Sequence, residues 1–316
     1  MQRTLLFGVS VFATLTLNVA LAASASAHGP AVHTMNVHSS KGAHHKGGSL
    51  LSSHGGAIER TPLVFITFWG SQWSSGFSTG GYTSAQAQSY ISGFFGGVGG
   101  SSWANSTTQY CQAVPSGTTN CALVGGAVDV TNPSRQLGGT WIDSSTVPSR
   151  LGTSSIAGEA LRAVAHFGYD ANADYMVFTP SGHSTSGFGT QFCAWHSSTS
   201  SSSGPVSFAN IPYQPDAGGA CGMNFVNQSN DSFGNGYFDG FSIVSGHEYA
   251  ETVTDPFPSS GWVDGSGAEN GDKCAWISSG QGAAQNVALG GNDYAVQSLW
   301  SNAFNSGAGG CVVSYP

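Results

Sequence analysis

The sequence predicts a single α+β domain in which a mixed sheet packs against a few helices, one of which carries a metal site. Apolar, β-rich runs at residues 62–70 and 174–180 indicate buried strands. Residues 83–98 and 153–168 have the apolar spacing of helices. Residues 61–316 are long enough to bury a sizeable core, and no second linker or fixed-period repeat divides them.

Each expected element has its own signal. Residues 62–70 are apolar and end at a glycine. Residues 83–98 open with a good N-cap candidate, and residues 153–168 form the clearest helix, since Ser or Thr opens it and Gly closes it. Residues 294–301 are a late strand candidate, whereas the serine-rich run at 197–203 is expected to be a surface loop.

The N-terminus is typical of a secretory signal peptide. Residues 1–27 combine a basic start at Arg3 with a long apolar run and small residues that predict cleavage after Ala27. Because the run lies at the extreme N-terminus and ends at such a site, we do not expect it to anchor the protein in a membrane. The sequence therefore predicts a secreted, extracellular protein.

Residues 28–60 differ from the rest of the chain. They contain six of the ten histidines among many Gly and Ser residues, and they lack hydrophobic periodicity. This composition favours a flexible tail. A metal-gathering tail and a removable pro-segment are the alternatives.

Charge is scarce. Charged residues make up 8% of the chain and the net charge is −8 at pH 7. This balance argues against nucleic acid and anionic membranes as partners. No apolar run after the signal segment is long enough to span a bilayer. We expect a monomer.

The six cysteines all follow the signal segment, and an even number in an exported chain indicates disulfides. Six cysteines allow 15 pairings, and their order alone cannot select one. Sequential pairing is the simplest arrangement. The spacings match no common zinc-cysteine motif.

The densest chemistry lies in "SGHEYAETVTDP", residues 245–256. Apolar spacing predicts a helix that Asp239 can cap and Pro256 stops. His247 and Glu251 are four residues apart, so they project from the same helix face, with Glu248 beside them. This spacing resembles the His-Glu-x-x-His helix of zinc hydrolases, in which the Glu after the first His activates water.

A third ligand has to come from elsewhere, and residues 264–276 offer Asp264, Glu269 and Asp272. Glu269 follows Glu251 by 18 residues, which is close to the separation in zinc peptidases that add a Glu to the helix. Clustered carboxylates repel one another, so a bound cation would relieve a real cost.

Glu in place of the second His weakens the motif and shifts the preference toward harder cations such as Ca²⁺ or Mn²⁺. A solvated helix face without metal and a catalytic pair of carboxylates are the alternatives. A serine hydrolase is disfavoured, because Ser184 lacks the Gly of a nucleophile elbow two residues later. His196, near Cys193, is either a residue that binds the transition state or an exposed loop histidine.

The order "FCAWHS", "CG" at 221–222, "SGHEYAETVTDP", "ENGDKCAW" and "LWSNAFN…GGCVV" resembles the Exordium or phosphate-induced protein family over roughly residues 60–316. The resemblance implies disulfides Cys193–Cys221 and Cys274–Cys311, which leaves Cys111 with Cys121. It also implies a zincin-like fold around the helix, since the microbial relatives look like zincin-type metallopeptidases. The plant relatives are extracellular, growth-related proteins without a settled reaction.

The resulting hypothesis is a zinc-dependent endopeptidase that acts on a protein or peptide substrate. His247, Glu251 and Glu269 are expected to bind Zn²⁺, and Glu248 to act as general base. Asp272 is expected at the metal or orienting His247 through its free ring nitrogen, and Asp255 is the rival ligand. The alternative is a non-catalytic cell-wall protein with a structural Ca²⁺ site.

Overall fold

The computed structural model describes residues 31–38 and 49–315. The expected signal peptide lies outside these residues. The fold is built on a mixed six-stranded sheet of order β1-β10-β11-β9-β3-β8. Its strands are β1 (Val32–Asn36), β3 (Leu63–Trp69), β8 (Leu137–Asp143), β9 (Ala173–Phe178), β10 (Phe192–Ser201) and β11 (Gly204–Ile211). The neighbours β8, β3, β9 and β11 run parallel, whereas β10 and β1 add antiparallel strands at one side.

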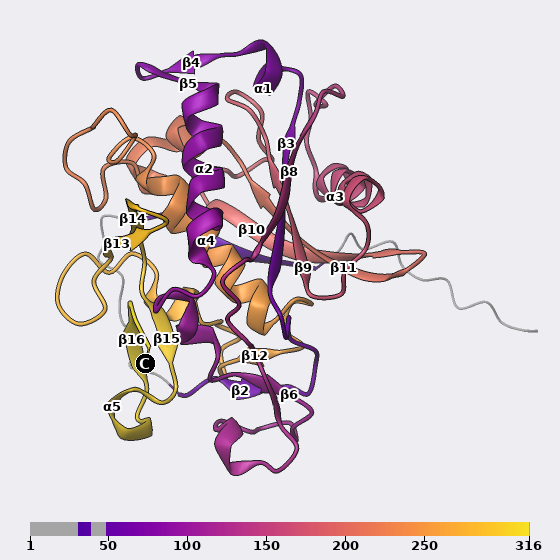
Figure 1. Cartoon of the computed structure of the whole chain (residues 1–316), viewed down its shortest axis with the longest axis vertical. Coiled ribbons are helices and arrows are strands. Elements are labelled where there is room, and N and C mark those ends of the chain that lie inside the picture. The colour runs from indigo at the N-terminus through magenta and orange to yellow at the C-terminus, as the bar shows by residue number, and fades with distance from the viewer. Residues whose placement is uncertain (1–30, 39–48, 316) are drawn as a thin grey trace, which may run out of the picture.

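The helices cover both faces of this sheet (Figure 1). They are α1 (Gln72–Ser75), α2 (Ser84–Val98), α3 (Thr153–Phe167), α4 (Asp239–Thr254) and α5 (Phe304–Gly307). Alternate residues of β3 point to opposite faces, so Val64 and Ile66 join the core beneath α2 and α4, while Phe65 and Trp69 pack against α3. The chain is thus a single compact domain with one mixed sheet, as the sequence predicts.

Smaller elements complete the domain. Residues 294–301, expected to be one strand, are divided between β14 and β15, so that prediction was wrong in extent. The short strands are β2 (Ser52–Ser53), β4 (Ser78–Thr79), β5 (Tyr82–Thr83), β6 (Cys111–Gln112), β7 (Val128–Asp129), β12 (Trp262–Val263), β13 (Gln285–Leu289), β14 (Asn292–Val296), β15 (Leu299–Ser301) and β16 (Gly310–Val312). The 3₁₀ turns are η1 (Ala104–Thr107), η2 (Cys121–Leu123), η3 (Gln214–Cys221) and η4 (Asp272–Cys274).

The helix ends follow the local sequence in α2 but not in α4. Thr83 caps α2 through a capping box with Gln86. Asp239, the expected cap of α4, is instead its first helical residue. Its carboxylate accepts the backbone N–H groups of Val226, Asn227 and Gly236, so it fixes the preceding loop.

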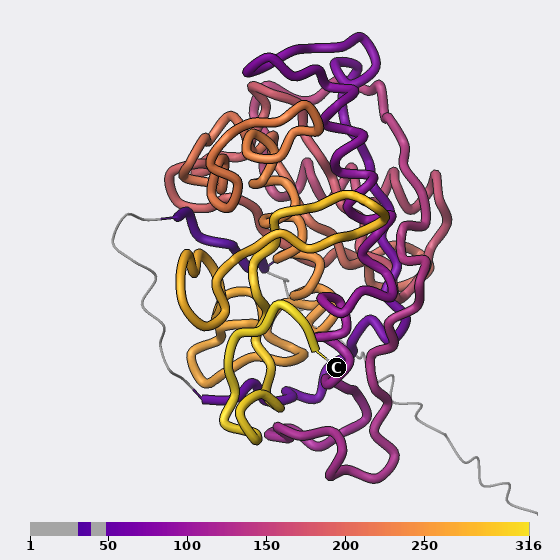
Figure 2. The backbone as a smooth tube through the Cα atoms, turned by 60° about the vertical axis from the view of Figure 1, so that its left-hand side comes forward, coloured from indigo at the N-terminus to yellow at the C-terminus, as the bar shows by residue number. Residues whose placement is uncertain are grey.

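Two segments expected to be loose belong to the fold. The serine-rich run at 197–203 forms the end of β10 and its hairpin with β11, not a surface loop. Within 28–60, residues 31–38 and 49–60 are described and pack on the domain, which does not fit a flexible tail there. Figure 2 shows these two segments in indigo at separate places on the molecule. The pro-segment alternative stays a prediction.

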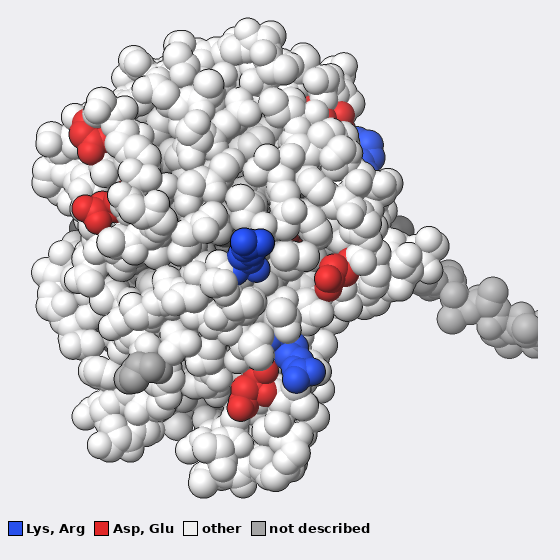
Figure 3. All heavy atoms as spheres, viewed as in Figure 1, with Lys and Arg blue, Asp and Glu red and all other residues white. Residues whose placement is uncertain are grey.

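The three disulfides are compatible with an extracellular protein. The disulfides Cys111–Cys121, Cys193–Cys221 and Cys274–Cys311 confirm the pairing that the resemblance implies. Figure 3 shows few charged groups on the viewed face, and they are scattered. Among residues 31–38 and 49–315, no helix combines the length and the apolar character that a membrane crossing needs.

Candidate metal centre

The site is built on α4, every residue of which is buried. Helix α4 lies between the sheet and β14, so it has no solvent face. Its small residues permit this packing. A Cβ on Gly240 would meet the Cys221 carbonyl oxygen at 2.2 Å, and one on Gly246 would meet Phe94 and Trp103 at 3.2 Å. The helix therefore carries His247, Glu248 and Glu251 into the interior.

Seven side chains from four parts of the chain meet beside this helix, and we call them the His-carboxylate cluster. It consists of His33 from β1, His196 from β10, His247, Glu248 and Glu251 from α4, and Glu269 and Asp272 from the loop after β12. Five of them have no exposed surface, and His33 and Asp272 lie at the outer rim with side chains 17% and 18% exposed.

Glu251 lies at the centre of the cluster. Its Oε1 is 3.0 Å from His247 Nε2 and also accepts the Asp272 backbone N–H at 3.0 Å. Its Oε2 is 3.6 Å from His196 Nε2. One carboxylate thus faces two imidazole rings, from the same helix and from the sheet.

Glu269 and Asp272 face the strand side. Glu269 Oε2 is 3.4 Å from His196 Nε2, and its Oε1 is 3.2 Å from His33 Nδ1. Asp272 Oδ2 is 2.5 Å from His33 Nε2, while its Oδ1 is 3.9 Å from His247 Nε2. The acidic loop therefore lies next to the helix, as the sequence predicts, and both rings from the sheet face carboxylates.

The tautomer of His247 is set by Gln297 and not by Asp272. Gln297 Nε2 donates to the Gly271 carbonyl oxygen at 2.8 Å, so its Oε1 is the atom 3.2 Å from His247 Nδ1. His247 Nδ1 must then carry a hydrogen. In the neutral ring the lone pair of Nε2 would face Glu251 Oε1, which is repulsive unless a proton or a cation lies between them. The expectation that Asp272 orients His247 is wrong.

Asp264 lies apart from the cluster. Asp255 borders it beside Glu269, whose pKa is raised by burial and further by Asp255, but Asp255 is held by other partners. Asp255, the expected rival ligand, accepts the backbone N–H groups of Ser259, Ser260 and Gly261 at 2.6 to 3.0 Å and so holds the turn after α4. Asp264 pairs with Lys273 Nζ at 2.7 Å. Although burial raises the pKa of Asp264, Lys273 and neighbouring donors lower it to about 2.

Burial shifts the pKa values of the carboxyl groups and of the imidazoles in the cluster in opposite directions. It raises the pKa of Glu248, Glu251 and Glu269, and the neighbouring carboxylates raise that of Glu248 and Glu269 further. Burial and the other two histidines lower the pKa of His196, which is therefore neutral. Although burial lowers the pKa of His33, Asp272 and Glu251 raise it to about 9.

Several donor atoms of the cluster have no hydrogen bond among the described residues. They are both ring nitrogens of His196, Nε2 of His247, both carboxylate oxygens of Glu248 and Glu269, and Oε2 of Glu251. Buried polar atoms nearly always have a partner, and buried carboxylates cost several kcal/mol without one. All of these atoms except a tautomeric N–H are electron-pair donors, which is what a cation requires.

The spacing of the donors also fits a small cation. Three groups within the cluster have atoms that all lie within 4.8 Å of one another: His33/His196/Glu269, His33/Glu251/Asp272 and His196/Glu248/Glu251. Tetrahedral zinc with bonds of about 2.0–2.1 Å places its ligand atoms about 3.3 Å apart. The separations of 3.4 and 3.6 Å from His196 to Glu269 and Glu251 are close to this value. His247, an expected ligand, is in none of the three groups.

His33 is not among the residues that the sequence predicts for the site, because the composition of residues 28–60 favours a tail. The alternation of "VHTMN" at Val32–Asn36 was the only local signal of a strand. His196, Glu248, Glu251, Glu269 and Asp272 are brought together as predicted residues of one site. No family model, curated protein or solved structure matches this chain. The function of the site therefore has to be inferred from its geometry.

Proposed function

We propose that this chain is a secreted, zinc-dependent peptidase that hydrolyses peptide bonds with Glu248 as general base. The observation that supports this proposal is the buried His-carboxylate cluster, several of whose donor atoms have no hydrogen bond among the described residues. The chain has few charged residues, yet three imidazoles and four carboxyl groups lie around one helix. The zincin-like character that the resemblance implies is part of the same proposal.

Zinc suits these donors better than calcium. Calcium takes oxygen ligands almost exclusively, whereas imidazole nitrogen is a common zinc ligand. We infer that His196 would hold the ion together with Glu251 and Glu269, whose carboxylate oxygens lie 3.6 and 3.4 Å from its Nε2. These three residues are not one of the three groups named above, so the two carboxylates would have to move toward each other around the ion. His247 would steady Glu251 from its other oxygen. When bound, zinc would supply a Lewis acid and lower the pKa of water.

Glu248 would move the proton. Its carboxyl group is fully buried and belongs to the same group of donors as His196 and Glu251. Burial, and then the charges of Glu251 and Asp272, raise its pKa, while the Met35 backbone N–H opposes this shift. A raised pKa brings a carboxyl group toward the range in which it can accept and return a proton near neutral pH.

A structural metal site in a non-catalytic extracellular protein is the second candidate. The complete burial of His247, Glu248 and Glu251 favours it, because a catalytic centre needs a path for substrate. The nitrogen donors count against calcium in that role, so the structural alternative also predicts zinc.

The metal content of the purified secreted protein is the first test, and zinc near one per chain is expected. Glu248→Gln should then retain the zinc and lose hydrolysis of an unfolded protein substrate. Chelation should remove activity and zinc should restore it. Activity that survives exhaustive chelation would refute the peptidase proposal. Zinc retention with no hydrolysis by the unaltered chain would favour the structural alternative.

A further inference from the structure

Strand β1 is held in the sheet by one neighbour only. It pairs antiparallel with β10, from Val32 opposite Ser197 to Asn36 opposite Phe192. Without β1, the strand β10 would be the edge of the sheet. Its unpaired N–H and C=O groups would then bind any peptide that can lie extended along them.

The inward face of β1 crosses the His-carboxylate cluster. Successive side chains of a strand alternate, so His33 and Met35 point toward α4 while Thr34 points away. The His33 ring lies between Glu269 and Asp272. Met35 is fully buried in the core, and β1 packs against α4, the helix that carries Glu248. The backbone of β1 thus passes beside the proposed general base.

The same strand separates the cluster from solvent. His33 is partly exposed at the rim, whereas His196 and Glu269 behind it have no exposed surface. A surface hollow of about 490 Å³ lies at this rim, lined by β1 together with Ser266, Ala268 and Asp272. On this side of the cluster, β1 therefore lies between the hollow and the buried donors.

We propose that β10 forms a peptide-binding edge of the sheet and that β1, a segment of the same chain, occupies this edge. An extended peptide segment would pair antiparallel with β10 in the place of β1, and β1 must leave before such a peptide reaches the cluster. His33 and Met35 are the inward side chains of β1 that contact the cluster and the core there. This inference rests on the proposed function only in treating the bound peptide as the substrate.

The tether makes β1 a strong competitor. A segment of the same chain acts at an effective concentration of the order of mM. A free peptide at micromolar concentration should therefore bind the intact protein weakly, and loosening β1 should strengthen binding. The probe is a fluorescent peptide with the sequence of residues 31–38, "AVHTMNVH".

The test measures fluorescence anisotropy with the full-length chain. The double variant His33→Ala/Met35→Ala should bind the peptide at least 10-fold tighter than the wild type. Thr34→Ala is the matched control, since its side chain is on the opposite face of the strand, and it should bind as the wild type does. Equal binding by the double variant and the control would overturn the proposal.

A crosslink gives the opposite perturbation. Val32 and Ser197 are directly opposite each other, so Val32→Cys/Ser197→Cys should join β1 to β10. The crosslinked chain should bind no peptide and hydrolyse no substrate, whereas each single variant should do both. Peptide binding by the crosslinked chain would overturn the proposal. Loss of zinc in His33→Ala would also overturn it, because β1 would then be a permanent part of the metal site.

The two proposals can fail separately. The anisotropy assay does not depend on hydrolysis. If the variants bind the peptide in the expected order but the chain holds no zinc and hydrolyses no substrate, the peptidase proposal fails and the peptide-binding edge stands. Zinc-dependent hydrolysis in the crosslinked chain would do the reverse.

Discussion

Gly271 lies where the acidic loop approaches α4, and Gly271→Ala should disrupt the centre. The backbone of Gly271 has φ −75° and ψ −47°, which alanine adopts without strain. Alanine is excluded because there is no room for its Cβ next to α4. Its Cβ would lie 2.7 Å from His247 Nδ1 and 3.0 Å from Glu251 Oε1, whereas ordinary contact begins at 3.4 Å.

The size of the effect follows from these distances. Relief of the closest contact requires a movement of about 0.7 Å, which is the difference between 2.7 and 3.4 Å. The His247–Gln297 contact is already 3.2 Å long, so such a movement breaks it. Overpacking of a buried site costs about 1–3 kcal/mol. Loss of a group that orients a ligand lowers metal affinity by about 10- to 100-fold.

Gly265→Ala in the same loop is the matched control, because a Cβ there meets nothing within 4 Å. Urea unfolding should give a free energy of unfolding about 1–3 kcal/mol lower for Gly271→Ala than for this control. Zinc titration should show the weaker binding in Gly271→Ala alone. Equal free energies of unfolding together with equal zinc affinities would refute the geometry of the loop and the helix.

Three further outcomes are expected. His196→Ala should weaken zinc binding more than His247→Ala, and the reverse order in a zinc titration would contradict the ligand set. Burial raises the pKa of Asp174 from 3.8 to about 8, so its contribution to stability is present below 3.8 and is lost as the pH rises to 8. Between pH 5 and 8, Asp174 should lower the unfolding free energy by about 1.4 kcal/mol per pH unit. Asp174→Asn should remove this part of the slope, and an unchanged slope would show that the carboxyl group is ionised. Cys274→Ala/Cys311→Ala opens a link between residues 37 apart and should cost about 3–4 kcal/mol in thermal or urea unfolding, so an unchanged stability would count against the link.

The features that the sequence predicts correctly depend on local patterns. Strand β3 and helices α2 and α3 were predicted within about one residue, because apolar periodicity and capping act over a single turn or pleat. The spacing of His247 and Glu251 predicts their shared helix face for the same reason. The disulfides were implied by a resemblance and are confirmed by the structure.

The features that the sequence analysis missed depend on contacts between distant residues. His33 reaches Asp272 across 239 positions of sequence, and nothing near His33 indicates that partner. Asp255 resembles a ligand because it follows Glu251 by four residues. Its oxygens, however, accept the backbone N–H groups of the turn at 259–261. Which carboxylates bind metal and which bind backbone N–H groups is decided by loops whose course local periodicity does not define.

The placement of acids gives the strongest reason to expect a cation at this centre. Ten of the sixteen Asp and Glu residues are buried, although such residues are almost never fully buried without partners. Five of the ten have such partners: Arg162 faces Asp143 and Glu159, Lys273 faces Asp264, and backbone N–H groups face Asp239 and Asp255.

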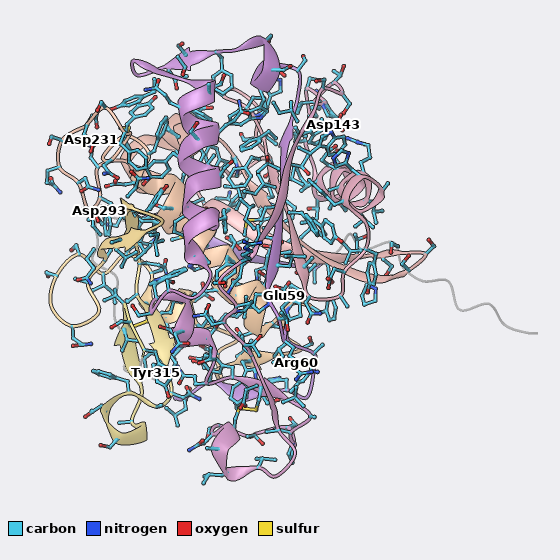
Figure 4. All side chains as sticks on the ribbon, viewed as in Figure 1. Glu59, Arg60, Asp143, Asp231, Asp293 and Tyr315 are labelled. Atoms are coloured by element: carbon cyan, nitrogen blue, oxygen red, sulfur yellow. A yellow bond between two sulfur atoms is a disulfide. The ribbon has the colours of Figure 1, made fainter. Side chains whose placement is uncertain are left out.

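Two places remain without such partners among the described residues. Glu59 (labelled in Figure 4) and Asp174 both have raised pKa values, first because of burial, and Asp174 raises that of Glu59 further, so retained protons neutralise this pair. The other place is the His-carboxylate cluster. There burial also raises the pKa of Glu251 and Glu269, and it keeps His196 neutral between them. Protons could be retained without a metal, whereas a divalent cation would satisfy both carboxylates and the free nitrogen at once.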